Sequence, residues 1–279
     1  MKPATNHARS LLRSGGATFA LLSTAMPAAY AAHSAECLIE PYQRLEIRSP
    51  VPGVIRTINA DRGSIVQKGQ VLVELDSRVE AAALSSARYR AGMQGEVKAA
   101  EARTRYAQVK FGRLDTLVKE HMVSHSDRDE AEASASVAAA DLAVARDNRE
   151  LAALEHQRMA EQLEQRRIRS PVAGVVTDRL QHVGELAQSN ETSKPILKLA
   201  VTHLLRVEVV LPVARLGSVH VGEVASIEPE PPLKGRWSAA VKQIDRVVDS
   251  ASGTFRVLLE LPNANGAIPA GIKCTASFR

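Results

Sequence analysis

Hydrophobic residues in the middle of the chain recur with the spacing of a coiled coil. Residues 77–166 contain no proline, and two series of mostly apolar positions advance by alternating steps of four and three. The first series is Met93, Val97, Ala100, Thr104, Ala107, Phe111, Leu114 and Val118. The second is Ala131, Ala135, Ala138, Leu142, Ala145, Arg149, Ala152, His156, Met159 and Leu163. Such spacing keeps one stripe of each helix against a partner, which predicts an antiparallel hairpin with arms of about 40 residues, roughly 60 Å long.

The turn of this hairpin is expected where both series stop. Residues 121–127 interrupt the spacing, and Ser126 or Asp127 is expected to cap the returning helix. Gly92 and Gly95 each weaken the first arm by about 1 kcal/mol relative to alanine, so we expect a kink there.

A repeated segment flanks the predicted hairpin. Residues 47–55 (IRSPVPGVI) recur as residues 168–176 (IRSPVAGVV), 121 positions later, with seven of nine residues identical. The turn residues of the two copies are Pro50, Gly53, Gly63, Pro171, Gly174 and Gly184. Each copy is a set of short β-segments that cannot bury a core alone, so we predict that the two copies form one β-sandwich. After residue 200, five or so alternating segments separated by turns predict a small barrel rather than an open sheet.

The N-terminus has the organisation of an export signal. Lys2, Arg9 and Arg13 precede an apolar stretch at residues 17–25, and Ala29-Tyr-Ala31 forms a small-x-small cleavage site. We expect residues 1–31 to be a cleaved signal peptide, with an uncleaved anchor as the alternative. Export to an oxidising compartment leaves two readings of Cys37 and Cys274, either a disulfide or two buried thiols.

The charge balance argues against nucleic-acid binding. The formal net charge is +5, but three of the basic residues lie in the signal segment, where no acidic residue occurs. The remainder has 33 basic and 31 acidic residues. A phosphate-binding surface needs a concentrated basic excess.

The split repeat resembles the lipoyl-type domain of periplasmic adaptor proteins, the membrane fusion proteins of the HlyD/AcrA family. Residues 248–256 also resemble the barrel domain of that family. The resemblance implies an α+β chain in which a split lipoyl-like β-sandwich carries an inserted coiled-coil hairpin and is followed by a small β-barrel. The implied domains are a sandwich of residues 44–76 and 167–200, a hairpin of residues 77–166 and a barrel of residues 37–43 and 201–279. The N-terminal strand of that barrel would bring Cys37 near Cys274. Many members continue into a membrane-proximal domain, which we do not expect after Arg279.

The resemblance also assigns a function to the hairpin tip. Arg113, Leu117 and Ser124 fit a motif that in such adaptors contacts a TolC-type outer-membrane channel. Leu117 would be an exposed apolar knob, Arg113 a hydrogen-bond donor and Ser124 a turn-packing hydroxyl. The resemblance implies a periplasmic adaptor, free or associated with the inner membrane, that links a channel to an inner-membrane RND or ABC transporter as a ring of three or six copies.

Three other classes of function are consistent with parts of the sequence. A lipoyl or biotinyl carrier needs an exposed lysine after the first repeat, but residues 75–79 read LDSRV and Lys68 precedes the closing strand. An inert coiled-coil spacer and a periplasmic substrate- or metal-binding protein remain as alternatives. His121 and His125 straddle the turn and make a poor metal pair, and we expect neither a metal site nor a cofactor. No nucleophile–base pair or phosphate-binding loop occurs, so we expect no enzymatic activity.

Overall fold

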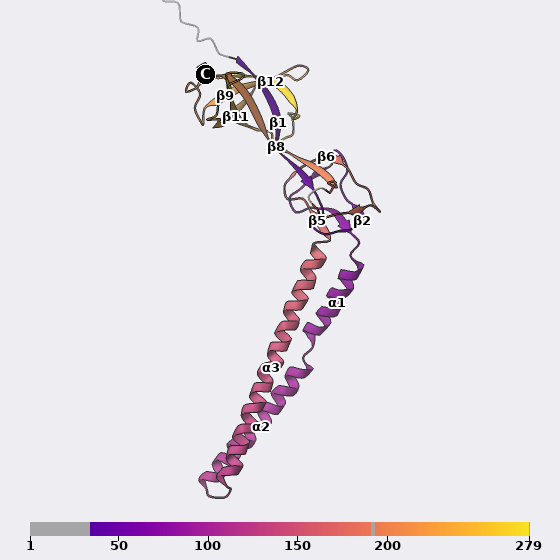
Figure 1. Ribbon diagram of the computed structural model, residues 1–279, viewed down its shortest axis with the longest axis vertical. Helices are drawn as coiled ribbons and strands as arrows, with labels where there is room; N and C mark the ends of the chain where they lie inside the picture. Colours follow the sequence, from indigo (N-terminus) through magenta and orange to yellow (C-terminus); the bar gives the residue numbers. More distant parts are fainter. Residues whose placement is uncertain (1–33, 191–192, 279) are drawn as a thin grey trace, which may run out of the picture.

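Three parts follow one another along an elongated molecule (Figure 1). The computed structural model describes residues 34–190 and 193–278, so the predicted signal peptide lies outside the described residues. A β-barrel occupies one end, a β-sandwich the middle and a helical hairpin the other end. Within the described residues, no helix is both long and apolar enough to cross a bilayer.

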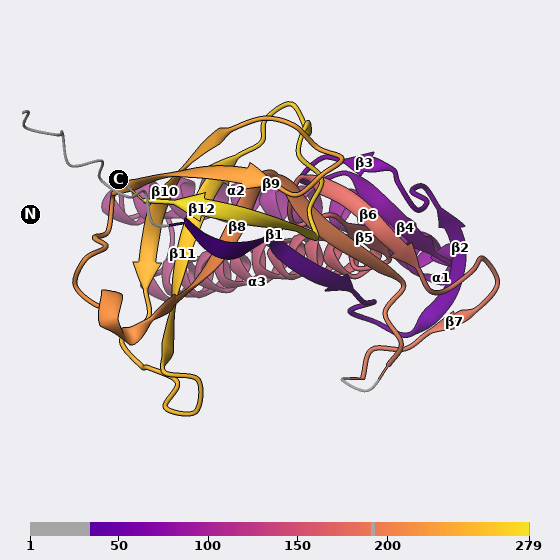
Figure 2. The same ribbon diagram turned by 90° about the horizontal axis from the view of Figure 1, so that it is seen from above.

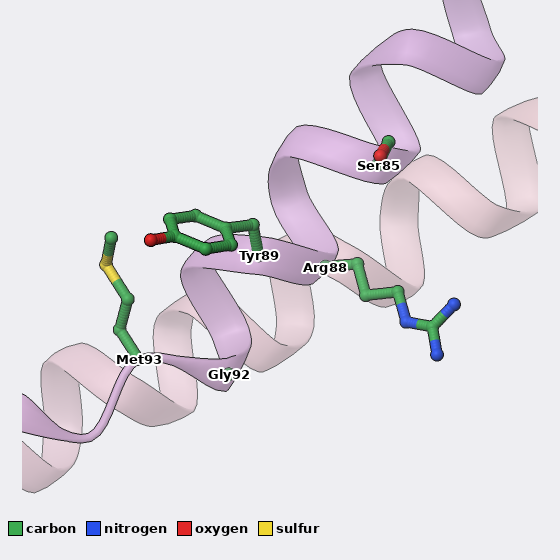
Figure 3. A pocket seen from close by; sticks show the side chains of 5 residues that line it. All are labelled: Ser85, Arg88, Tyr89, Gly92 and Met93. Carbon is green, nitrogen blue, oxygen red and sulfur yellow. The ribbon is translucent and has the colours of Figure 1, made fainter.

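The hairpin has an interrupted first arm and a continuous second arm. Its helices are α1 (Arg78–Gly92), α2 (Gly95–Lys119) and α3 (His125–Glu164). The kink expected from the two glycines is a complete break, since Met93 has extended backbone angles and 55% of its surface is exposed. Figure 3 shows this break, with the Tyr89 and Met93 side chains on one side of the ribbon and Arg88 on the other. Met93 is therefore not part of the buried seam, contrary to the sequence prediction.

Small side chains bring the two arms close together. The buried seam residues are Ala87, Val97, Ala100, Thr104, Ala107 and Val118 on the first arm and Ala131 and Ala145 on the second. The Thr104 hydroxyl lies 2.8 Å from the carbonyl oxygen of Ala138, across the seam. Arg149 is exposed, so its predicted seam position is wrong. The reason is that the seam partner at this level is the broken segment around Met93, which leaves space for solvent.

The sandwich is made of two sheets that exchange strands between the repeats. Its short strands are β2 (Gly53–Ile58), β3 (Ile65–Val66), β4 (Val71–Leu75), β5 (Arg167–Arg169), β6 (Gly174–Arg179) and β7 (Leu186–Ala187). One sheet has the order β5-β4-β2-β7. The other contains the ends of two longer strands, β1 (Ser34–Ile47) and β8 (Leu197–Pro212), which pair with each other. In this sheet β6 pairs with β8, and β3 pairs with β6. Each sheet thus contains strands from both copies.

Equivalent hydrogen bonds show that the exchange is symmetric. The amide of Gly63 donates to the carbonyl of Val176 at 2.8 Å, and the amide of Gly184 donates to the carbonyl of Ile55 at 2.9 Å. Gly63 and Gly184 are 121 residues apart, and so are Ile55 and Val176, which is the offset of the repeat. The predicted pairing of two copies into one sandwich is confirmed, and neither half can close without the other.

The repeat glycines serve two different purposes. Gly63 and Gly184 have φ angles of +86° and +91°, a region that favours glycine. Gly174 is needed for close packing instead, because a Cβ there would lie 2.3 Å from the carbonyl oxygen of Ala200. At Gly53 a Cβ would lie 2.6 Å from Nη1 of Arg166. We expected turn geometry to explain Gly53 and Gly174, and the actual reason is the close approach of a neighbour.

The prolines of the repeat are exposed, and the serines before them are buried. Pro50 and Pro171 lie in loops at the surface. Ser49 and Ser170 are 5% and 2% exposed, and their hydroxyls donate to the carbonyls of Val51 and Val172 at 2.5 and 2.6 Å. The repeated Ser-Pro pair therefore starts each loop with a satisfied buried hydroxyl.

Six antiparallel strands close the barrel. In ring order they are β1, β12 (Ile272–Ser277), β9 (Val224–Pro229), β10 (Trp237–Ile244), β11 (Thr254–Pro262) and β8, which pairs back to β1. A short 3-10 helix, Val213–Arg215, follows β8. Apolar side chains fill the interior, and Figure 2 shows the strands around it from above. The predicted fold class is confirmed.

Strands β1 and β8 belong to both β-domains. They pair from Cys37 opposite Val209 to Ile47 opposite Leu197, with one irregularity between Pro41 and Gln43. The expected domain limits at residues 43/44 and 200/201 fall inside these two strands.

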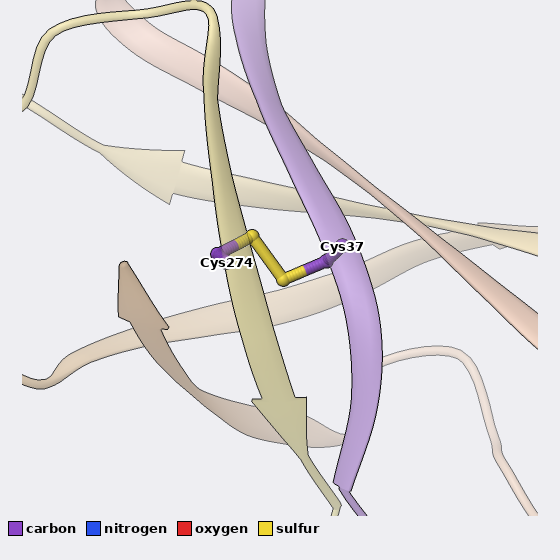
Figure 4. Close-up of a disulfide and its surroundings, with 2 residues drawn as sticks. All are labelled: Cys37 and Cys274. Atoms are coloured by element: carbon purple, nitrogen blue, oxygen red, sulfur yellow. A yellow bond between two sulfur atoms is a disulfide. The ribbon is translucent and has the colours of Figure 1, made fainter. Parts of the chain in front are cut away.

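A disulfide joins β1 to β12, the first and last strands of the barrel in the chain (Figure 4). Cys37 on β1 and Cys274 on β12 are directly opposite in the ladder, with their Cα atoms 4.8 Å apart. Of the two readings that the sequence left open, the structure has the disulfide. It closes a loop with a sequence separation of 237, which in the chain-entropy account stabilises the fold by about 5 kcal/mol.

Replacing Gly174 tests the close packing of β6 on β8. We expect Gly174→Val to lose about 3 kcal/mol of unfolding free energy, because a backbone carbonyl cannot move aside. Gly53→Val should lose less, since its nearest neighbour is the end of a flexible side chain. Urea unfolding followed by circular dichroism measures both, and Gly112→Ala, in open space on α2, is a control that should not lower the urea midpoint. An unchanged urea midpoint for Gly174→Val would contradict this packing.

Candidate functional site at the hairpin tip

A capping box starts the returning helix. Ser124, not Ser126 or Asp127, is the N-cap of α3. Its hydroxyl accepts from the Asp127 amide at 3.2 Å and donates to the Asp127 carboxylate at 2.6 Å. The carboxylate also accepts from the Ser124 amide at 3.3 Å. Asp127 thus acts from the third helical position, which is the reciprocal arrangement of a capping box, so the predicted cap was wrong by two or three residues.

The first arm ends with a left-handed residue that is not glycine. His121 has a φ angle of +60°, its amide donates to Val118 at 2.9 Å, and the Met122 amide donates to Leu117 at 2.9 Å. These two bonds satisfy the last carbonyls of α2 in the manner of a Schellman motif. The sequence offers no glycine here, so the sharp end of α2 could not be placed from composition.

One arginine ties the two arms together just behind the tip. Arg128 of α3 contacts the Asp115 carboxylate of α2 at 3.1 Å, and its guanidinium lies 5.4 Å from the ring centre of Phe111. Arg128 also pairs with Asp129 and Glu132 in its own helix, at 2.9 Å each. Hydrogen bonds hold the pKa of Asp115 below its ordinary value, so this carboxylate stays charged. The bond from Lys119 has the larger effect and the bond from Arg128 the next.

The three predicted contact residues do not form a single cluster. Arg113 is exposed and makes no ion pair or side-chain hydrogen bond within the described chain. Leu117, one turn further on, is half-buried, whereas we expected an exposed apolar knob. The two share a surface hollow of about 360 Å³ whose other lining residues are Tyr106, Val109, Lys110 and Leu114. Ser124 lies across the turn and has a structural role as the cap.

A second apolar seam runs along the outer face of each arm, and the sequence reasoning missed it. On α3 it comprises Ala133, Val137, Ala140, Val144, Asp147, Leu151, Leu154 and Arg158, all exposed. On α2 it comprises Ala99, Ala102, Tyr106 and Val109, also exposed, and it ends before Arg113. Each residue follows a predicted seam residue by two positions, which is about 200° around a helix. The same alternation of four and three was the signal that could have revealed this outer seam.

The outer seam leaves large apolar side chains uncovered. Val137, Val144 and Leu151 lie seven residues apart and are 62%, 57% and 63% exposed. Single exposed apolar residues are ordinary, but a row at heptad spacing is what a coiled coil presents to a partner.

The two tip histidines lie on opposite sides of the turn. His121 ends the first arm, and His125 is the first residue of α3. Across residues 34–190 and 193–278, no three histidine, cysteine, aspartate or glutamate side chains gather into a metal-binding group.

A closed barrel, a sandwich of two exchanged repeats and an inserted hairpin define the barrel-sandwich hybrid class. Residues 43–196 match the family described as CzcB-like, barrel-sandwich hybrid domain, and the chain belongs to this family. The family resemblance seen in the repeat is therefore confirmed.

Relatives carry names from multidrug resistance. The chain is 27% identical over 247 residues to multidrug resistance protein MdtE of Escherichia coli K12, covering 85% of this chain and 61% of that relative. It thus spans about three fifths of the relative's length. Multidrug resistance protein MdtA of Klebsiella pneumoniae is 25% identical over 240 residues, covering 80% of this chain and 52% of that protein.

Two solved structures share the fold. MacA from Actinobacillus actinomycetemcomitans has a TM-score of 0.73 at 20% identity, covering 88% of this chain and 78% of that one. The membrane fusion protein Spr0693 from Streptococcus pneumoniae R6 has a TM-score of 0.62 at 17% identity, covering 88% and 98%.

Ser124→Ala tests the capping box. We expect it to lose about 1 kcal/mol of stability and to speed amide exchange in the first turn of α3, because the orphan amides lose their acceptor. Ser126→Ala, an exposed position inside the same turn, is the matched control and should change neither. Equal losses in the two variants would contradict the assignment of Ser124 as the cap.

Proposed function

We propose that this protein is a periplasmic adaptor subunit that links an inner-membrane transporter to a TolC-type outer-membrane channel for export. The observation that carries the proposal is the hairpin itself, whose two arms have apolar seams on both faces. One seam is used within the chain and the other is free for further helices. A membrane-fusion or multidrug-resistance role in relatives agrees with this assignment.

The outer seams account for assembly into a ring. The inner seam joins α2 to α3, so the two outer seams face away from each other on the sides of one flat hairpin. The outer seam of α2 in one copy can then pack on the outer seam of α3 in the next, with the same four-and-three spacing on both. A closed ring of three or six copies would use every outer seam and surround a central passage.

The tip is then the part of the ring that reaches a channel. The capping box, the left-handed His121 and the Arg128–Asp115 pair hold it in one conformation. Arg113 has no intramolecular partner in the described chain and keeps its donors free for carbonyls or carboxylates of a channel. Beside it, the half-buried Leu117 provides apolar surface.

The two alternatives explain less of the molecule. A substrate-binding protein needs a concave pocket, but the barrel is filled by its own side chains, and the hollow near Leu38 and Val210 lies on its outer face. A spacer needs no apolar seam on its outer faces. A scaffold role needs no catalytic group, so we assign no enzymatic activity. The transporter, of the RND or ABC type, would supply the energy.

Photo-crosslinking from position 117 in the native host tests the proposal directly. We expect adducts with an outer-membrane channel, identified by mass spectrometry. Arg113→Glu and Leu117→Asp should each reduce export at least tenfold, because one reverses the free charge and the other puts a charge in the contact. Arg105→Glu, an exposed charge reversal two turns back on α2, is the control. Adducts only with soluble proteins, or normal export by both tip variants, would overturn the channel assignment.

A second prediction concerns the ring. Val144→Glu combined with Leu151→Glu should weaken self-association at least tenfold in sedimentation velocity, because two charges would be buried without partners. Ser136→Glu combined with Ala143→Glu adds the same charge to exposed positions beside the seam and should have a smaller effect. Equal weakening by the two pairs would show that net charge, not the outer seam, controls association.

A further inference from the structure

The hairpin and the sandwich are joined without a shared apolar core. The buried cluster of the sandwich contains no helical residue, and that of the hairpin contains only helical residues. The covalent links are short: β4 ends at Leu75 and α1 begins at Arg78, while α3 ends at Glu164 and β5 begins at Arg167. The direction in which the hairpin leaves the sandwich must therefore depend on polar contacts at its base.

Arg166 makes three of these contacts, and Arg169 of β5 makes another, to Glu164 at the end of α3 at 2.7 Å. It lies in the second link, where its carbonyl accepts from the Leu75 amide at 2.9 Å. One arm of its guanidinium contacts Glu80, in the first turn of α1, at 2.5 Å. The other donates to the carbonyl of Pro52, just before β2, at 2.8 Å. The side chains of Arg166 and Glu80 are only 21% and 19% exposed, so water screens this pair less than the surface pairs along the helices.

The missing side chain of Gly53 leaves room for this guanidinium. A Cβ at Gly53 would lie 2.6 Å from Nη1 of Arg166. In the second repeat the equivalent glycine, Gly174, lies against a backbone carbonyl instead. The same repeat position is therefore used once for sheet packing and once to admit a side chain from the base of the hairpin.

We propose that Arg166 is a positioning residue that fixes the direction of the hairpin relative to the sandwich. Its planar fork reaches a carboxylate on the helix and a carbonyl on the sandwich at once, which a lysine cannot do. Since the arms are about 60 Å long, a tilt of about 10° at the base moves the tip by about 10 Å. The functional importance of this inference rests on the proposed channel contact, because the direction of the hairpin matters only if its tip binds a channel.

Distance measurement between spin labels tests the proposal on the isolated full chain. One label is placed at Val183→Cys in the sandwich and the other at Ala139→Cys on α3, both exposed positions. We expect Arg166→Gln and Gly53→Ala each to broaden the distance distribution at least twofold, and Arg166→Lys to restore part of the parent width. Arg146→Gln, which breaks an exposed pair with Glu101 within the hairpin, is the matched control and should leave the width unchanged.

Urea unfolding of the same variants separates positioning from stability. A lower midpoint with an unchanged distance distribution for Arg166→Gln would mean that Arg166 only stabilises the fold, and would overturn the proposal. A distribution equally broad in Arg146→Gln would overturn it too. Because no channel is present in the measurement, failure of the crosslinking test would refute the proposed function and leave the positioning role intact.

Discussion

The pairing of β1 with β8 is the interaction on which the other parts depend. These strands run together from the barrel into the sandwich, so one ladder closes the barrel and also forms the edge from which a sandwich sheet grows. The first repeat begins at the end of β1 and the second finishes at the start of β8, so the ladder brings the ends of the repeat together. The remaining ends, β4 and β5, pair in the other sheet, and the hairpin is inserted between them.

Features with a regular period could be predicted from the sequence. The four-and-three spacing gave the hairpin, and the 121-residue offset gave the two-copy sandwich, because both are set by patterns within the chain. The N-cap was misplaced because Ser124, Ser126 and Asp127 all favour caps, and only the backbone of the turn chooses among them. The left-handed backbone of His121 and the contact of Arg166 at the base of the hairpin gave no sequence signal. Each depends on the position of another part of the chain, which the local sequence does not reveal.

The outer seam was hidden for a different reason. A helix with apolar residues on two opposite faces has little net amphipathicity, so a search for one apolar stripe finds the stronger stripe and treats the rest as solvated. Ala133 and Ala140 alternate with Val137 and Val144 along this second face. A monomer does not use the second face, whereas the proposed ring would.

The disulfide gives the molecule a covalent topology suited to bearing load. Everything between Cys37 and Cys274, including the sandwich and the whole hairpin, lies inside one closed loop. A pull on the tip is passed through the sandwich to β1 and β8, which lie along the long axis of the molecule and are loaded lengthwise (Figure 1). Many ladder bonds then share the tension at once, and the cross-link prevents the two ends of the barrel from separating. The cross-link therefore keeps β1 joined to β12 when the hairpin is pulled.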